Sequence, residues 1–168
     1  YHLLRARRIL THPINYIRRR HYAKAVMRHM RRRGSIPRTA GHAPVKLNML
    51  PGSQAAVAAC QSLFHERRNR DFTKDVKPFY ANILKEQDLL EKPELLEFAL
   101  GDRVIEMVTD YLGTLPRLTA IGLQYSPVST TTISSQKFHI DGDDFHQVKC
   151  FINVFEVTRD DGPLSFLS

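Results

Sequence analysis

The spacing of apolar residues changes once along the chain, and this change most restricts the folds open to it. Up to about residue 112 the apolar residues recur every three or four positions, which is typical of amphipathic helices. After residue 117 they alternate or run together with β-branched and aromatic residues, which is typical of strands. We expect helices at residues 2–11, 14–33, 54–69, 78–91, 93–100 and 102–112, and strands at 118–125, 136–141, 148–157 and 164–167. Helices followed by strands predict an α+β fold.

Single residues mark where several of these helices begin and end. Pro13 separates the first two helices, and Ser53 is placed to cap the third. Pro93 suits the first turn of a short helix, because its missing N–H has no partner within the helix there. Asp102 is placed to cap the last helix, and Gly113 follows the final turn, where a left-handed residue is common. The sequence therefore predicts helix ends as well as helices.

Charge divides the chain into two parts. The first 65 residues contain 13 Lys and Arg and no Asp or Glu. The rest contains 12 Lys and Arg against 17 Asp and Glu, so its net charge is 12 − 17 = −5 within a total of +8. Residues 34–52 are rich in Gly and Pro, which indicates a linker. We therefore expect a basic helical arm and linker at residues 1–52 and a second domain at residues 53–168.

The basic arm has two open interpretations. Ile14 and Ile17 begin an apolar face that Tyr22, Val26 and Met30 continue at helical spacing. Without acidic residues, residues 1–46 are suited to contact a polyanion, either a nucleic acid or an anionic membrane surface. Alternatively, the arm packs on the acidic second part of its own chain. If the arm is the functional part, the protein is a non-catalytic binding protein.

The composition excludes several other classes of protein. Hydrophobic residues make up 42% of the chain, which is too many for a disordered chain. No apolar run approaches the roughly 20 residues that a membrane-spanning helix needs, so we expect no transmembrane segment. Two cysteines, Cys60 and Cys150, make no disulfide framework and favour a reducing compartment, which predicts a cytoplasmic protein.

One short motif has the chemistry of a metal site. In His139-Ile140-Asp141 the imidazole and the carboxylate are two residues apart, and alternate residues of a strand point to the same face. Both groups can therefore converge on one cation. One further His would complete the two-His-one-carboxylate set of non-haem Fe(II) oxygenases. The spacing alone is also compatible with a surface His and Asp at the end of a strand.

The residues around this motif form a longer pattern. The segment 135–144 (SQKFHIDGDD) precedes the apolar segment 148–155 (VKCFINVF), and the acidic turn 160–164 (DDGPL) follows. Upstream lie 111–113 (YLG), Pro116 and 123–127 (LQYSP). Over about residues 78–168 the chain resembles the phytanoyl-CoA dioxygenase-like family of Fe(II)/2-oxoglutarate-dependent oxygenases.

The resemblance implies a double-stranded β-helix, or jelly roll, preceded by a helical lead-in and incomplete at the C-terminus. His139 and Asp141 match the family's first two iron ligands. No His follows His146, so the second His and the basic residue that anchors 2-oxoglutarate are expected beyond Ser168, and the chain is expected to be an inactive fragment of a dioxygenase. The implied activity is hydroxylation of an unidentified small molecule with Fe(II), 2-oxoglutarate and O₂.

Three further residues are candidates for contact with 2-oxoglutarate. Gln124 and Tyr125 lie on the strand before the metal motif, where they either touch the co-substrate or pack in the core or at an edge. Lys149 lies in an apolar strand and either pairs with a carboxylate of the co-substrate or faces outward into solvent.

Overall fold

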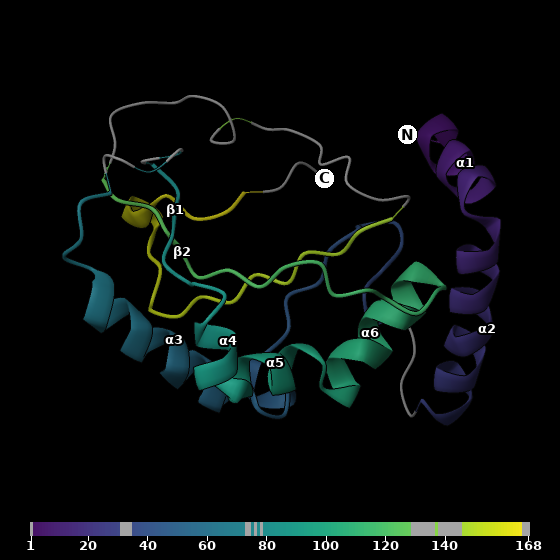
Figure 1. The fold of residues 1–168 in the computed structure, drawn as a ribbon, viewed down its shortest axis with the longest axis horizontal. Coiled ribbons are helices and arrows are strands. Elements are labelled where there is room, and N and C mark those ends of the chain that lie inside the picture. The colour runs from purple at the N-terminus through teal and green to yellow at the C-terminus, as the bar shows by residue number, and fades with distance from the viewer. Residues whose placement is uncertain are drawn as a thin grey trace.

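Helices form the lower layer of the molecule in Figure 1, and extended chain lies above them. The computed structural model describes residues 2–30, 35–72, 75, 77, 79–128, 137 and 146–165. The lower layer contains α3 (Ser53–Arg67), α4 (Asp88–Glu91), α5 (Pro93–Ala99) and α6 (Asp102–Leu112). α5 packs against both α3 and α6, so neighbouring helices in the layer are also close in sequence. Together with two short strands, these helices confirm the mixed α+β class.

Helix α3 presents small residues to the core. Ala56, Ala59 and Leu63 recur at helical spacing and are buried, which forms one apolar face. The residue that precedes the helix is Gly52, with φ of 79°, so the prediction that Ser53 caps it is wrong. Ser53 is instead the first helical residue, and its Oγ donates to the Leu47 carbonyl 2.8 Å away, in the short 3₁₀ helix η1 (Leu47–Met49).

Helices α5 and α6 follow the sequence signals closely. α5 begins at Pro93, as predicted. α6 ends before Gly113, whose φ of 68° is the left-handed conformation that favours glycine, and the Gly113 N–H donates to the Thr109 carbonyl at 2.8 Å. Gly101, in extended conformation, precedes α6, so Asp102 lies in the first turn and is not the N-cap. An acidic residue there still stabilises the helix through its dipole.

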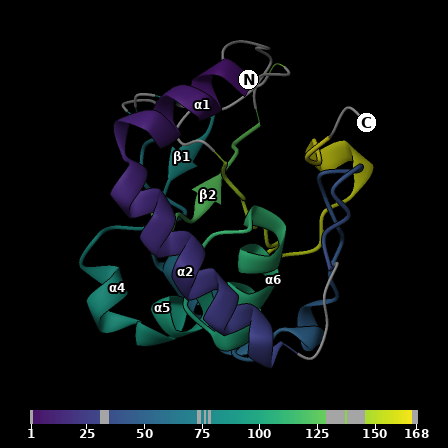
Figure 2. The same cartoon turned by 90° about the vertical axis from the view of Figure 1, so that its right-hand side faces the viewer.

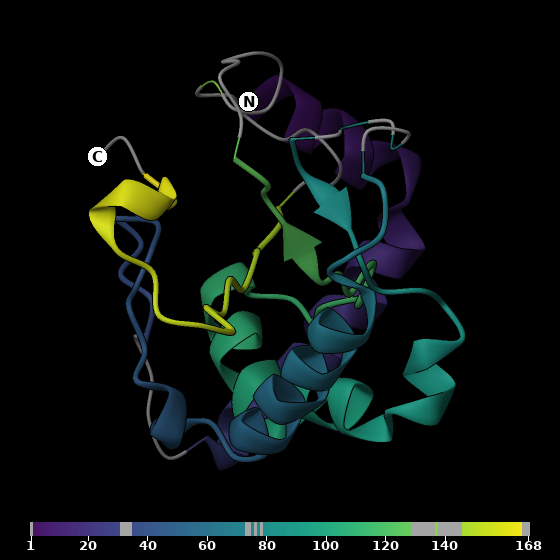
Figure 3. The ribbon, with the colours of Figure 1, turned by 90° about the vertical axis from the view of Figure 1, so that its left-hand side faces the viewer.

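The expected helix over residues 78–91 is wrong. This segment contains the strand β1 (Ala81–Asn82) and only one short helix, α4. β1 pairs antiparallel with β2 (Gln124–Tyr125), with Ala81 opposite Tyr125 and Asn82 opposite Gln124. Figure 3 shows this pair above α3. The paired residues are 44 and 42 positions apart in sequence, so long-range pairing overrides the local helical pattern (125 − 81 = 44 and 124 − 82 = 42).

The expected long strands are shorter than predicted or unpaired. Only the last two residues of the predicted strand 118–125 belong to β2. Residues 148–157 form no strand in the part of the chain that the structure describes. They still lie on the core, since Ile152 and Val154 pack against it while Phe151 and Phe155 are exposed. Of the predicted strand 136–141 only Lys137 is described, and no jelly roll is present among the described residues.

The core fills the space between the helices and the extended chain. Its centre is formed by buried side chains from α3, α5, α6, the residue after η1 and the segments around β1 and β2: Leu50, Ala56, Ala59, Leu63, Ile83, Leu84, Leu95, Phe98, Met107 and Leu123. Because both layers contribute, burial of this cluster stabilises the helices and the extended segments together.

The basic arm consists of α1 (His2–Thr11) and α2 (Pro13–His29) and stands at one end of the molecule (Figures 1 and 2). α2 packs on α6, where Ala23 is completely buried. Two hydrogen bonds fix the contact: Arg19 Nε donates to the Leu115 carbonyl at 2.8 Å, and the Leu115 N–H donates to the Arg19 carbonyl at 3.0 Å. The arm therefore packs partly on its own chain. Among the described helices and strands, α1 packs only against α2.

The predicted apolar face of α2 is divided between two sides of the helix. Val26 and Met30 are half-buried, whereas Ile14, Ile17 and Tyr22 are exposed. The side of α2 that packs on α6 is centred on Ala23. At 100° per residue, Ile14 and Ile17 fall on the opposite side of the helix and are therefore exposed. None of the described helices is long and apolar enough to cross a bilayer.

Candidate functional site

The two predicted iron ligands, His139 and Asp141, lie outside the described residues. The nearest described residue before them is Lys137. β2 ends 14 positions before His139 (139 − 125 = 14), and the extended segment after the motif begins at His146. Within the described part of the chain, no group of three or more His, Cys, Asp or Glu side chains is placed to hold a metal ion. The described segments that flank the motif in sequence include β2 and residues 146–157.

Gln124 and Tyr125 point to opposite sides of β2, since successive residues of a strand alternate. The Tyr125 ring centroid lies 5.4 Å from that of Phe64 on α3 and 5.1 Å from that of Phe72 in the segment after α3. Gln124 is exposed on the other side. These two neighbours therefore have different surroundings: Tyr125 packs among aromatic rings, and Gln124 is open to a ligand.

An aromatic cluster joins the extended segment to α3. The Phe155 ring lies 5.1 Å from Phe64 and 5.9 Å from His65, both with edge-to-face geometry. Beside it, Gln61 Nε2 donates to the Val154 carbonyl at 3.0 Å. Residues 152–155 are thus held beside β2 by side chains of one helix. Sequence reasoning missed this contribution of α3, although the aromatic pair at positions 64 and 65 of an otherwise Ala-rich helix is its visible signal.

Lys149 and Cys150 lie at the start of the same segment and are both exposed. The exposure of Lys149 is compatible with either of its predicted roles. Cys60, by contrast, is half-buried against the core, and burial raises the pKa of its thiol. Both cysteines are free thiols.

Asn82 fixes the pairing of β1 with the chain before β2. Its Oδ1 accepts from the Leu123 N–H at 3.1 Å, and its Nδ2 donates to the Leu84 carbonyl at 3.1 Å. The Ile83 N–H donates to the Leu123 carbonyl at 2.8 Å. One amide side chain therefore supplies hydrogen bonds where the two-residue ladder ends.

A buried ion pair holds β1 and α4 on α3. Asp88 is 1% exposed, and both of its carboxylate oxygens accept from the Arg67 guanidinium, at 2.5 and 2.6 Å. The Lys85 N–H donates to Asp88 Oδ2 at 2.6 Å, and Arg67 Nη1 also donates to the Ile83 carbonyl at 3.1 Å. The Arg67 side-chain hydrogen bonds lower the pKa of Asp88 to about 2, against the opposing effect of desolvation.

This ion pair makes stability depend on acid pH. The folded-state pKa of Asp88, about 2, lies below its ordinary value of 3.8, so its contribution is complete above about pH 5 and is lost progressively as the pH falls through 2. We expect the stability difference between the natural chain and the Asp88→Asn variant to narrow progressively from pH 5 to pH 2. Urea unfolding of both proteins across this range measures it. A difference that does not change with pH would contradict the assignment.

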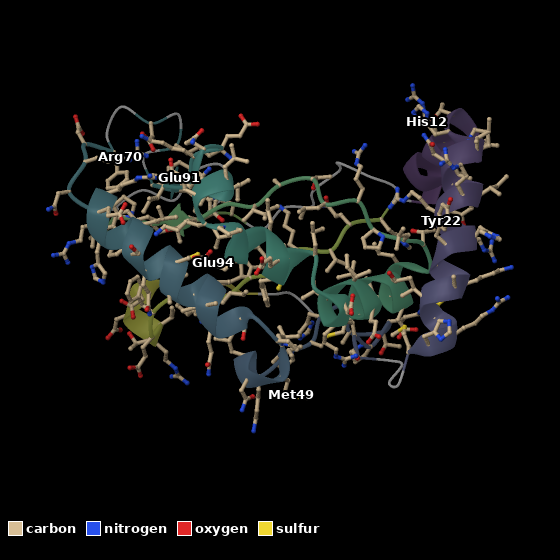
Figure 4. All side chains as sticks on the ribbon, turned by 60° about the horizontal axis from the view of Figure 1, so that its bottom comes forward. His12, Tyr22, Met49, Arg70, Glu91 and Glu94 are labelled. Atoms are coloured by element: carbon tan, nitrogen blue, oxygen red, sulfur yellow. The ribbon has the colours of Figure 1, made fainter. Side chains whose placement is uncertain are left out.

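A hollow beside β1 is lined by Arg67, Arg70, Lys85 and their neighbours, with a volume of about 460 Å³. Its two arginines already have acidic partners: Arg67 pairs with Asp88, and Arg70 pairs with Asp75 at 2.6 Å. The Arg70 guanidinium also stacks 4.6 Å above the Phe72 ring. Figure 4 shows Arg70 and Glu91 at the end of the molecule away from the arm. The two arginine charges at this hollow are therefore used for folding contacts.

No family model, curated protein or solved structure matches this chain. The features that bear on function are therefore the residues of the metal motif, the segments that flank it in sequence, and the charge and exposure of the arm.

Proposed function

We propose that this chain carries the iron-binding strand of an Fe(II)/2-oxoglutarate-dependent dioxygenase, with His139 and Asp141 as two iron ligands. The observation that carries the proposal is the order of three elements: His139-x-Asp141, the apolar segment 148–157 and the acidic Gly-Pro turn at residues 160–163. The same order underlies the resemblance to the phytanoyl-CoA dioxygenase-like family. A jelly roll is the architecture that goes with this proposal.

The described segments on either side of the motif support it. β2 precedes the motif, and residues 152–155 follow it, held on α3 by Phe64 and Gln61. Tyr125 of β2 and Phe155 thus both contact Phe64, so the segments on either side of the motif in sequence meet on one helix.

The turn at the end of this segment is a built element. Asp161 Oδ2 accepts from the Thr158 N–H at 2.7 Å and from the Thr158 hydroxyl at 2.6 Å, and these bonds lower the pKa of Asp161. The short 3₁₀ helix η3 (Arg159–Asp161) lies between these partners, and Gly162 follows with φ of 67°. A left-handed residue at this place favours glycine, so the Asp-Gly-Pro sequence meets a backbone requirement.

The donor set fits a ferrous ion, because an imidazole nitrogen and a carboxylate oxygen both belong to the facial triad. Bound Fe(II), together with 2-oxoglutarate and O₂, supplies the oxidising chemistry for hydroxylating a small-molecule substrate. Asp141 supports hydroxylation over halogenation, since its carboxylate takes the position that a halide needs. Gln124 and Lys149, both exposed, are the candidates for binding the co-substrate carboxylates, whereas Tyr125 serves packing. The free cysteines suit a reducing compartment such as the cytoplasm.

Anaerobic titration of the 168-residue chain with Fe(II) and 2-oxoglutarate tests the proposal. A 2-oxoacid chelated to Fe(II) gives a visible charge-transfer absorption, which reports the complex without turnover. We expect the natural chain to develop this absorption with an affinity below that of a complete facial triad, because no His follows His146 to serve as the third protein ligand. His139→Ala and Asp141→Ala are expected to weaken Fe(II) binding by roughly a hundredfold, since even changes to groups that only orient a ligand cost 10- to 100-fold.

Matched controls exist for both ligands. His42→Ala removes an exposed imidazole in the linker, and Asp160→Ala removes an exposed carboxylate in the turn. Both controls are expected to retain the absorption. If the natural chain shows none, or if the ligand variants behave like these controls, the proposal is overturned.

A further inference from the structure

The arm exposes aliphatic side chains that the fold does not use. Leu10 is 78% exposed, Ile14 72% and Ile17 64%. At 100° per residue, Ile14 lies half a turn around α2 from Ala23, the residue buried against α6, and Ile17 lies on the same outward half. Scattered exposed aliphatic residues are ordinary, but Ile14 and Ile17 lie about one turn apart on α2, and Leu10 is exposed near the end of α1.

The inner side of α2 already has its partner. Arg19 and Leu115 exchange two hydrogen bonds, and Ala23 is completely buried at the contact with α6. The outward side is therefore presented by a helix that is held in place, and it does not need to change position to meet a partner.

The outward side is also uniformly basic. Arg18, Lys24 and Arg28 are exposed on α2 together with Ile14 and Ile17, and the first 65 residues contain no acidic side chain. Such a surface is complementary to a negative one. The same charge opposes packing of one arm against the arm of a second copy, since like charges repel.

We propose that this outward face of α1 and α2 docks on an anionic lipid bilayer surface. Basic side chains beside exposed aliphatic ones match the two layers of that surface, because the charges meet the headgroups while Leu10, Ile14 and Ile17 enter the acyl boundary. The phosphates of a nucleic acid would bind the basic side chains, but they gain nothing from three exposed aliphatic side chains. Figure 4 shows His12 and Tyr22 on the arm, at the opposite end of the molecule from Arg70 and Glu91, so docking leaves the rest of the chain clear of the bilayer.

Co-sedimentation of the full chain with vesicles measures docking. We expect binding to vesicles of phosphatidylcholine and phosphatidylserine in equal parts, and at least tenfold weaker binding to pure phosphatidylcholine. The double variant Ile14→Ser/Ile17→Ser keeps the charge and is expected to bind the anionic vesicles about tenfold more weakly, because the apolar contribution is lost. Higher salt is expected to weaken the binding of the natural chain to the anionic vesicles, because it screens the charges.

The matched control is Leu90→Ser, which removes an equally exposed aliphatic side chain, 75% exposed, from α4. It is expected to bind like the natural chain. Equal binding by the Ile14→Ser/Ile17→Ser variant and this control would overturn the proposal. The proposal would also be overturned if both variants bound single-stranded RNA equally and neither bound anionic vesicles. That result would assign the basic face to nucleic acid. Dimerisation that depends on Ile14 and Ile17, without vesicle binding, would assign the face to a second copy.

A fluorescence measurement tests insertion directly. The chain contains no Trp, so Ile17→Trp and Leu90→Trp each introduce a single reporter at an exposed position. We expect anionic vesicles to shift the emission of Ile17→Trp to shorter wavelength and to leave Leu90→Trp unchanged. An unshifted Ile17→Trp spectrum in the presence of sedimenting protein would contradict insertion.

Discussion

Replacing Asp88 by Ala is expected to lower the free energy of unfolding by about 3 kcal/mol, because it leaves the Arg67 guanidinium without its carboxylate in a largely buried position. Asp88 also accepts the Lys85 N–H, so the substitution removes the partner of a backbone donor as well. Arg67 joins α3 to α4 through Asp88 and to the Ile83 carbonyl, which follows β1. Loss of the Asp88 carboxylate therefore weakens the contact between α3, α4 and the segment after β1.

Urea unfolding at neutral pH, followed by far-ultraviolet circular dichroism, measures this change. The matched control is Asp75→Ala, which breaks the Arg70–Asp75 pair, where the arginine side chain is 41% exposed. A solvent-exposed pair is expected to contribute less than about 1 kcal/mol. Similar losses for Asp75→Ala and Asp88→Ala would show that burial of the Arg67–Asp88 pair has no special effect on stability.

Leu63→Ala is expected to destabilise the fold by about 3 kcal/mol, from lost apolar burial and from the cavity that remains. Leu63 is 2% exposed and belongs to the cluster that joins the helical layer to the extended chain. Its neighbours in that cluster are contributed by several elements, so local collapse cannot fill the space without moving a helix.

The same urea measurement applies, with Leu90→Ala as the control. Leu90 is 75% exposed, and its truncation is expected to change stability by less than about 0.5 kcal/mol. A midpoint for Leu63→Ala that equals the control would exclude Leu63 from the stabilising core. A changed urea dependence, in contrast, would indicate an altered unfolded or native ensemble.

The metal motif shows how far sequence reasoning reaches for function. His139 and Asp141 were identified by residue type and spacing, and they stay predictions because both lie outside the described residues. The surroundings were less predictable. Tyr125 was an open choice between co-substrate contact and packing, and only its distances to Phe64 and Phe72 place it in an aromatic cluster. Such contacts depend on where α3 lies relative to β2, and the residues near Tyr125 in sequence do not predict that position.

Local signals determined the helices whose ends depend on single residues. The arm divides at Pro13, α5 begins at Pro93, and α6 ends before Gly113. In each place the backbone requirement is intrinsic to the residue: proline has no N–H to donate, and glycine alone takes the left-handed conformation without cost. Those features need no tertiary partner.

Tertiary structure decided what depends on partners distant in sequence. Residues 78–91 have helical spacing, yet β1 forms there because Gln124 and Tyr125 supply a pairing edge and Asp88 meets Arg67. Residues 148–157 have strand composition, yet within the described chain they pack through Ile152 and Val154 without a paired strand. The sequence by itself therefore determined the helix boundaries at Pro13, Pro93 and Gly113 and the division of charge along the chain. Tertiary structure decided the pairing of strands and the exposure of Ile14 and Ile17, because pairing and burial are properties of two segments and a local pattern describes only one.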